Sequence, residues 1–284
     1  MKKKLSFFVV AMEMIILSGC SSDYYYANTF LRKFETGRKN TTEQIYVVLP
    51  REVIHTNSSL GSVHGFAYMN EREQDSVITS LTKILNCIND SIFLDQFNNA
   101  FLFTLSRTCI PVVVLSDASK MPIADDQHFT VNIVQLEAEE FVQHQRSDFQ
   151  TKKGLYYAYD YDLRHFSVNT WLKLDACDTT SSVYFRNKEI EERFQGTVKS
   201  IKDGRATLKT NFELIDVNDA YKLAKSLGAE CATLYIEKIL TEYVCRTKGT
   251  NDTYFYYDPR YNMIESVLPY DEGIKESFEV MSDL

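Results

Sequence analysis

The chain has 284 residues, of which 44% are hydrophobic, 25% charged and 13% aromatic, as in an ordinary folded globular protein. Ten glycines and five prolines are too few for a low-complexity or collagen-like chain. The formal net charge is −8, and an acidic chain without a basic stripe is not expected to bind nucleic acid.

The first 20 residues have the pattern of a secretory signal. Three lysines (residues 2–4) precede a mainly apolar stretch (residues 5–17), and the segment ends in Leu17-Ser18-Gly19-Cys20. The apolar stretch is too short to span a bilayer. Its last four residues resemble the lipobox of bacterial lipoproteins. The resemblance implies that residues 1–19 are a signal peptide, and that Cys20 receives a diacylglycerol and an N-acyl chain after cleavage.

Residues 20–44 are polar and are interpreted as the acylated cysteine followed by a flexible tether, spanning roughly 25–30 Å. Cleavage removes three lysines and one glutamate, which leaves the mature chain more acidic. We therefore expect acyl chains, and not attraction to anionic lipids, to hold the protein at the membrane. Ser21 and Ser22 after the cysteine resemble the sorting signal for outer-membrane delivery. Whether the protein faces the periplasm or the cell surface stays open.

The hydrophobic pattern predicts a single α/β domain over residues 45–247. A β-branched run at residues 45–49 indicates a strand. Apolar residues at three- and four-residue spacing then predict helices over residues 75–88 and 89–105. A short apolar run at residues 112–115 predicts a buried strand.

The middle of the chain changes to the two-residue alternation of strands. Such alternation occurs at residues 129–133 and 166–174, with a tyrosine-rich strand at residues 156–161 between them. A hairpin is predicted over residues 194–212 around Asp203-Gly204, a pair that suits a tight turn.

The clearest predicted helix covers residues 217–246, with Asp216 as its N-cap and Asp219 in a capping-box position. Residues 248–284 are predicted to add a tyrosine-rich strand and a loosely held acidic tail. Gly228 costs roughly 1 kcal/mol inside a helix, so close packing is the expected compensation. It belongs to a stripe of small residues spaced by four: Ala220, Ala224, Gly228 and Ala232.

This order of elements predicts an α+β fold, with a mixed, largely antiparallel sheet and helices packed on one face. The order is similar to that of the TolB N-terminal domain and of transport-auxiliary lipoproteins. Three segments, Tyr46-Val47-Val48-Leu49-Pro50, Asn169-Thr170-Trp171 and Ala224-x-x-Leu227-Gly228, resemble stretches of uncharacterised outer-membrane lipoproteins of Bacteroidota. That resemblance implies an envelope location and transfers no catalytic residue.

The cysteines give no redox or zinc motif, because no Cys-x-x-Cys occurs. Cys231 and Cys245 fall on one predicted helix, about 21 Å apart, and a disulfide needs α-carbons within about 7 Å. Buried apolar thiols are favoured over a disulfide framework, although an oxidising compartment leaves the latter open. The thiols concerned are Cys87, Cys109, Cys177, Cys231 and Cys245.

No catalytic residue and no metal site are predicted. Glycine-rich phosphate loops, Gly-x-Ser-x-Gly and His-Glu-x-x-His are absent from the sequence. Ser80-Leu81-Thr82-Lys83 matches the Ser-x-x-Lys of penicillin-binding enzymes, but chance produces such matches and the Ser-Asp-Asn element is missing. The sequence also has two clusters of carboxylates. For both, a solvated face is favoured over a glycosidase pair or a calcium site. The first cluster is Glu137, Glu139 and Glu140, and the second is Asp160 and Asp162.

Tyrosine is abundant, with 18 residues, and it suits half-exposed surfaces because its ring packs while its hydroxyl stays hydrated. One interpretation is an aromatic face that binds a sugar, a peptide or a partner barrel. The favoured alternative is that tyrosine serves as a strand former. The candidate binding residues are Tyr156, Tyr159, Tyr161, Tyr254, Tyr256 and Tyr257.

We therefore expect a non-enzymatic, membrane-anchored envelope lipoprotein that acts as an accessory or binding component in envelope assembly or transport. The expected location is the outer membrane, and the expected partner is another envelope protein. No cofactor is expected beyond the acyl chains on Cys20. The alternative is a small envelope hydrolase acting on glycan or peptide.

Overall fold

The computed structural model describes most of the predicted domain. The predicted signal peptide, Cys20, Cys177 and the turn at Asp203-Gly204 lie outside the described residues. The described residues are 25–33, 42–123, 128–150, 154, 156–175, 183–202, 205–249, 253–269 and 279–281.

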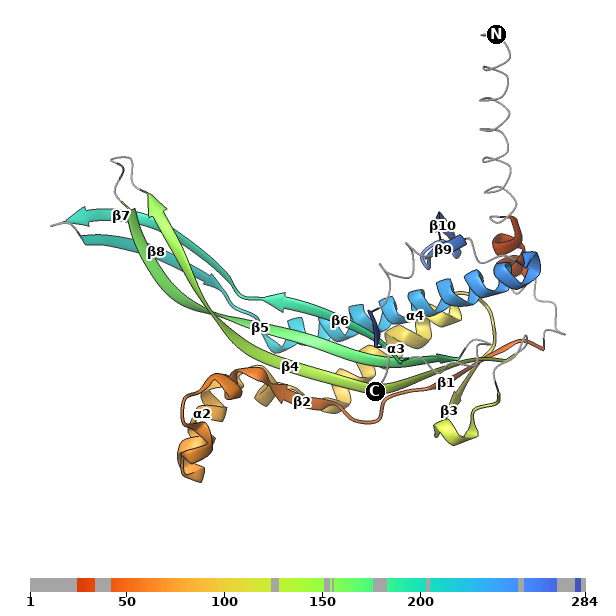
Figure 1. Cartoon of the computed structure of the whole chain (residues 1–284), viewed down its shortest axis with the longest axis horizontal. Helices are drawn as coiled ribbons and strands as arrows, with labels where there is room; N and C mark the ends of the chain where they lie inside the picture. The colour runs from red at the N-terminus through yellow and green to blue at the C-terminus, as the bar shows by residue number, and fades with distance from the viewer. Residues whose placement is uncertain are drawn as a thin grey trace, which may run out of the picture.

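Seven strands within the described residues form one mixed sheet (Figure 1). The order is β11-β6-β5-β4-β1-β3, and β2 pairs with β4 beyond β1. Strands β1 and β2 pair parallel with β4, and β3 pairs parallel with β1. The pairs β4–β5, β5–β6 and β6–β11 are antiparallel. The strands are β1 (Gln44–Val48), β2 (Ile54–Asn57), β3 (Val112–Leu115), β4 (His128–Gln150), β5 (Tyr156–Asp175), β6 (Val183–Glu191) and β11 (Glu279–Met281).

Two helices, α3 (Asp90–Ser106) and α4 (Val217–Lys248), lie together on one face of the sheet (Figure 1). Asn89 caps α3 by accepting the Ile92 N–H, and Asp216 and Asp219 form the predicted capping box of α4. The predicted α+β class, with helices packed on one face of a mixed sheet, is therefore confirmed. Short 3-10 turns lie at Ser58–Ser62, Phe66–Tyr68, Leu85–Cys87 and Ala118–Lys120.

Helix α2 (Glu71–Leu81) differs from the prediction at both ends. It begins earlier than residue 75, because Asn70 and Glu73 form a capping box. It stops before residue 88, because the backbone N–H groups that follow bind the side chain of Glu140 and leave the helical ladder.

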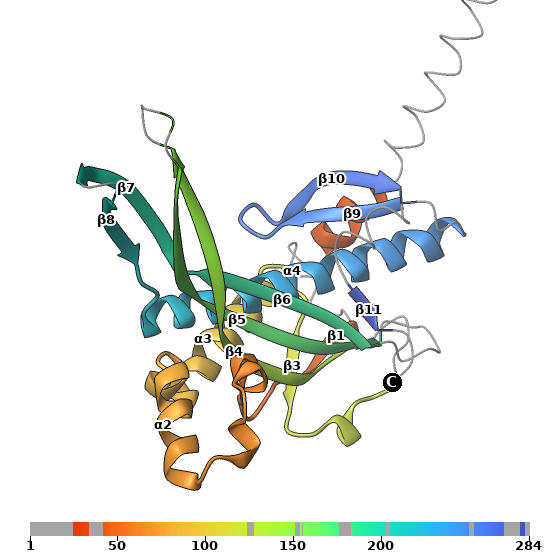
Figure 2. The ribbon, with the colours of Figure 1, turned by 60° about the vertical axis from the view of Figure 1, so that its left-hand side comes forward.

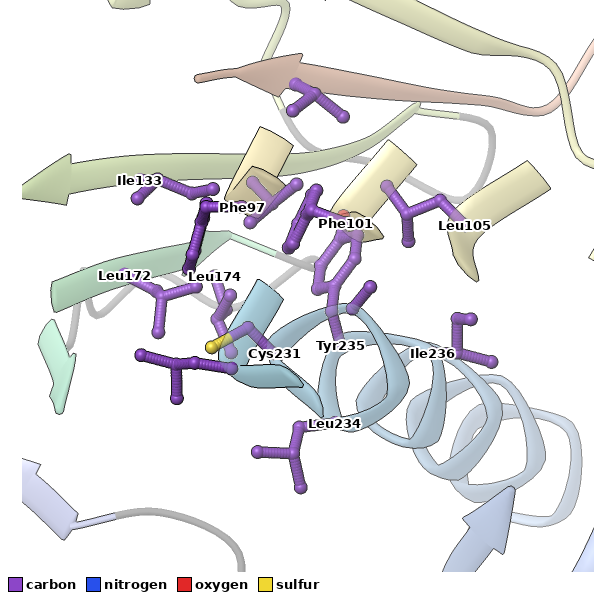
Figure 3. Packing of buried hydrophobic residues seen from close by; sticks show 14 of the residues in the cluster. Phe97, Phe101, Leu105, Ile133, Leu172, Leu174, Cys231, Leu234, Tyr235 and Ile236 are labelled. Atoms are coloured by element: carbon purple, nitrogen blue, oxygen red, sulfur yellow. The ribbon is translucent and has the colours of Figure 1, made fainter. Parts of the chain in front are cut away.

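The hydrophobic core fills the space between the sheet and the helix pair. Figure 3 shows Phe97 and Phe101 of α3 beside Leu172 and Leu174 of β5, with Tyr235 of α4 close to them. These side chains are at most 5% exposed. The small-residue stripe of α4 is buried as well, and it allows close approach to α3.

Residues 25–33 form a helix, so the prediction of a flexible tether over residues 20–44 is wrong for this part of the chain. Ala27, Phe30 and Leu31 are at most 2% exposed. The Phe30 ring lies 4.4 Å from the ring of Tyr243 near the end of α4. Figure 2 shows this helix against α4.

The C-terminal segment is also more ordered than predicted. The hairpin of β9 (Thr253–Asp258) and β10 (Met263–Pro269) covers α4 (Figure 2). Strand β11 pairs with β6 at the edge of the sheet. The prediction of a loose acidic tail is therefore wrong for the residues of β11.

The outer halves of β4 and β5 extend beyond the rest of the sheet (Figure 1). The predicted strands at residues 156–161 and 166–174 are one continuous strand, β5. A second hairpin, β7 (Arg193–Lys202) and β8 (Arg205–Glu213), packs on this extension through aromatic rings. We call these two ribbons, residues 141–150 with 156–164 and 193–213, the arm.

Candidate functional site

A groove of about 1110 Å³ runs between α3 and α4 and ends at the turn after β9. The lining residues of α3 recur at three- and four-residue spacing and include the buried Ala100 and Thr104 at the edge of the core. The lining residues of α4 recur at the same spacing. We call it the cationic groove, and its defining residues are Phe103, Arg107, Lys222, Lys225, Pro259 and Arg260.

Arg107 joins the wall formed by α3 to the turn after β9. Its guanidinium donates to the carbonyl oxygens of Pro259 at 3.1 Å and Arg260 at 2.9 Å. It also lies 5.9 Å from the centre of the Phe103 ring, which is 65% exposed. Because these acceptors are neutral, the contacts fix the side chain without cancelling its charge.

The other three cations differ in their partners. Lys222 donates to Asp219 at 2.9 Å, and this bond raises the pKa of Lys222 and lowers that of Asp219. Arg260 forms a bidentate pair with Asp258, whose pKa it lowers. Lys225 has no partner among the described residues.

The four charged side chains that line the groove are all basic, in a protein whose net charge is −8. Asp219 and Asp258 pair with two of them, Lys222 and Arg260. The basic lining of the groove contrasts with the acidic overall charge of the chain. Guanidinium and ammonium groups bind carboxylates and phosphates. The exposed Phe103 ring adds an apolar contact surface.

The predicted aromatic face is not one surface. Tyr159 and Tyr161 stack on Phe194 inside the arm, with ring centres 5.4 and 4.0 Å from it. Tyr156 lies near the arm tip and is 72% exposed.

The other three predicted tyrosines belong to β9. Tyr254 and Tyr257 are at most 2% exposed and bind Glu237 of α4, and Tyr256 is half-buried against Tyr254. The hydroxyl of Tyr254 and the N–H of Tyr257 lie 3.0 and 2.9 Å from this carboxylate. The sequence pattern correctly indicated strands here, but the strands bury most of these rings.

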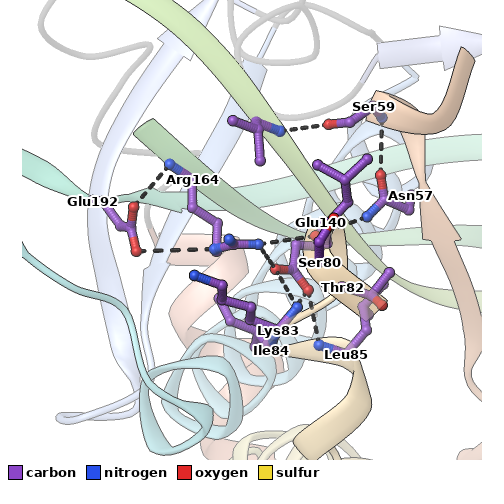
Figure 4. Close-up of polar contacts among 12 residues, drawn as sticks. Asn57, Ser59, Ser80, Thr82, Lys83, Ile84, Leu85, Glu140, Arg164 and Glu192 are labelled. Carbon is purple, nitrogen blue, oxygen red and sulfur yellow. Dashed lines mark hydrogen bonds and ion pairs between the residues drawn. The ribbon is translucent and has the colours of Figure 1, made fainter. Parts of the chain in front are cut away.

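The carboxylate cluster in β4 includes a buried member, Glu140, so the solvated-face interpretation is wrong for this residue. Glu140 accepts the N–H groups of residues 83–85 and pairs with Arg164, which also contacts Glu192 (Figure 4). Asn169 donates to both Glu137 and Glu139. The bonds of Glu140 join the turn after α2 to the sheet, and those of Asn169 join β5 to β4.

The second carboxylate pair behaves as a solvated face. Asp160 and Asp162 are 56% and 66% exposed and lie near Arg146 and His144. The Ser-x-x-Lys match is not an assembled site, because the Ser80 hydroxyl donates to the carbonyl of Val77. Among the described residues, no group of three or more His, Cys, Asp and Glu side chains could hold a metal ion.

The four described cysteines form no disulfide with one another, but the prediction of buried thiols holds only in part. Cys87 and Cys109 are exposed, and Cys245 is half-buried. Cys231 is buried, and this burial raises the pKa of its thiol. Cys231 and Cys245 lie on the same helix, as expected.

The sequence did not point to the cationic groove, because its cations come from three segments far apart in the chain. The only local signal is the repeated placement of Lys222 and Lys225 on the exposed face of a helix. Arg107 and Arg260 join them only through the packing of α3 and the β9–β10 hairpin on α4.

No family model and no curated protein matches the chain. A solved structure of a proposed neuraminyllactose-binding hemagglutinin homolog from Helicobacter pylori is similar, with 10% sequence identity and a TM-score of 0.31. The match covers 75% of this chain and 92% of that one. A likeness this weak supports no argument about fold or function. None of the described helices is long and apolar enough to cross a membrane.

Proposed function

We propose that the protein is a non-enzymatic envelope lipoprotein, anchored through acylated Cys20, that binds an acidic segment of another envelope protein in its cationic groove. The outer membrane is its proposed location, and its role is that of a binding component in envelope assembly or transport. The observation that carries the binding role is the convergence of four cations around an exposed phenylalanine in an otherwise acidic protein.

The proposed ligand class follows from the chemistry of the groove walls. Lys225 and Arg107 offer charges that no described carboxylate neutralises, so an acidic side chain gains attraction there without displacing an internal partner. Phe103, Ala100 and Ala229 line the same groove and supply apolar contact. A volume of about 1110 Å³ exceeds what a single small metabolite fills and suits several residues of a polypeptide.

No specific observation among the described residues favours the hydrolase alternative. Glu140, the most buried carboxylate of the β4 cluster, is held by three backbone N–H groups and Arg164. Because it already bonds the chain itself, its observed contacts are those of a structural residue.

The test is capture of partners from detergent-solubilised membranes by the mature protein and by Lys225→Glu. Lys209→Glu is the matched control, because Lys209 is exposed on β8 in the arm and the substitution changes the net charge equally. We expect one stoichiometric partner, at least about fivefold weaker capture by Lys225→Glu, and unchanged capture by Lys209→Glu. Capture should also weaken as salt rises. Recovery of no partner, or equal loss in both variants, contradicts the proposal.

A further inference from the structure

The helix at residues 25–33 is a fixed part of the domain. Its inward side chains are buried, Phe30 contacts Tyr243, and Lys33 pairs with Glu43 just before β1. The position of this helix relative to a membrane therefore fixes the position of the whole domain.

Only five residue steps separate Cys20 from Tyr25. In any conformation their α-carbons lie at most about 18 Å apart. If Cys20 is acylated, as the proposed function states, Tyr25 must lie within that distance of the headgroups that surround the anchor. The domain therefore lies closer to the membrane than a 25-residue tether would allow.

The surface nearest to this attachment has the chemistry of a membrane interface. Tyr25 and Tyr26 are 68% and 36% exposed, and tyrosine is enriched where membrane meets water. Arg32 is exposed on the same helix. Arg246 and Lys248 are exposed in the last turn of α4, which lies beside this helix (Figures 1 and 2).

The charge of this surface is only modestly positive. Glu43 pairs with Lys33, and Glu242 lies 3.8 Å from Arg246. Attraction to anionic headgroups is therefore a secondary contribution, of about 1 kcal/mol per basic residue at most. The exposed tyrosines and the short connection to Cys20 are the main reasons for contact.

We infer that the surface formed by Tyr25, Tyr26, Arg32, Arg246 and Lys248 rests on the headgroups of the membrane to which Cys20 is anchored. This inference rests on the proposed lipid anchor. It places the C-terminal end of α4 at the membrane. The α4 residues that line the cationic groove, Lys222 to Ala229, lie about 20–30 Å back along α4 from Tyr243. The arm lies at the opposite end of the long axis of the molecule (Figure 1).

The experiment compares two tyrosines of nearly equal exposure at opposite ends of the molecule. Tyr25→Trp and Tyr156→Trp are made separately in the full, acylated chain, where the native residues are 68% and 72% exposed. Trp171 is present in both variants and contributes the same background fluorescence to each. Each protein is reconstituted in vesicles of phosphatidylcholine and phosphatidylglycerol that contain brominated phosphatidylcholine, which quenches tryptophan at short range.

We expect at least about twofold stronger quenching of the added fluorescence for Tyr25→Trp than for Tyr156→Trp, because only the first site lies at the headgroup layer. Equal quenching, or stronger quenching at position 156, overturns the inference.

Palmitate labelling and vesicle flotation of the unsubstituted chain separate this result from the proposed function. A labelled, floating protein without quenching at position 25 disproves only the orientation. An unlabelled protein disproves the anchor, and the inferred orientation with it.

Discussion

Gly228 of α4 lies directly against the backbone carbonyl of Phe97 in α3. A β-carbon at position 228 would approach that oxygen more closely than real β-carbons ever do. The close crossing of α3 and α4 therefore requires a residue without a side chain at position 228. This explains why a glycine occurs inside a helix, where it is intrinsically unfavourable.

Gly228→Ala should destabilise the protein by about 1–3 kcal/mol, measured as the free energy of unfolding in urea. Alanine gains about 1 kcal/mol of helix propensity, but the α3 backbone cannot move away without disturbing the core, and overpacking of this kind costs more. Ser226→Ala, on the exposed side of α4, is the control and should be neutral or slightly stabilising. Equal effects of both substitutions would show that the close crossing does not matter.

Glu237 should make stability depend on pH. Burial raises its pKa from 4.5 to about 7, although Tyr254 and Tyr257 donate hydrogen bonds to it. The folded state thus holds the proton more tightly than the unfolded state. The contribution of this group to stability is complete below about pH 4.5 and is lost as pH rises to about 7, a loss of about 3 kcal/mol.

Glu237→Gln tests this pH dependence. The glutamine stays neutral, so the variant should gain stability relative to the parent as pH rises from about 4.5 to about 7. Urea unfolding at both ends of this range measures the difference. A constant difference between variant and parent across the range would mean that Glu237 does not titrate there.

Arg164→Met should destabilise the protein by about 3–5 kcal/mol, because it leaves the fully buried carboxylate of Glu140 without its ionic partner. Arg146→Met is the matched control on the neighbouring strand. Arg146 is 65% exposed and lies 3.7 Å from Asp148, and exposed pairs of this kind contribute about 1 kcal/mol or less. Thermal or urea unfolding distinguishes the two. A small effect of Arg164→Met would mean that the backbone N–H groups alone hold Glu140.

Cys20→Ala should abolish palmitate labelling and move the protein from the membrane fraction to the soluble fraction, because acyl chains are its proposed attachment. Cys87→Ala is the control, since Cys87 is an exposed free thiol within the domain. It should leave labelling unchanged. Persistent labelling of Cys20→Ala would show that the lipobox interpretation is wrong.

The elements whose signals are local were predictable from the sequence. The capping box of α4 at Asp216 and Asp219 was visible because capping depends on residues three positions apart. The strands β1 and β3 were visible from their β-branched runs. The small-residue stripe of α4 correctly indicated close packing, which the structure shows to be against α3.

Other features depended on contacts between distant segments. The helix at residues 25–33 has only three fully buried side chains, and without α4 to cover them the segment looks like a polar tether. The tyrosine-rich runs predicted strands, but not that Tyr254 would donate a hydrogen bond to Glu237. They also did not show that other tyrosines would stack on Phe194. The early end of α2 depended on Glu140, which lies on β4.

By itself, the sequence determined the class of fold, most of its helices and strands, and the lipobox that predicts an anchor. Tertiary structure alone decided the cationic groove, because Arg107, Lys225 and Arg260 become neighbours only when α3 and the β9–β10 hairpin pack on α4. Local patterns follow from hydrogen bonds and side-chain periodicity within a segment. A binding surface depends on which distant segments pack together, and burial of the whole hydrophobic core decides that packing.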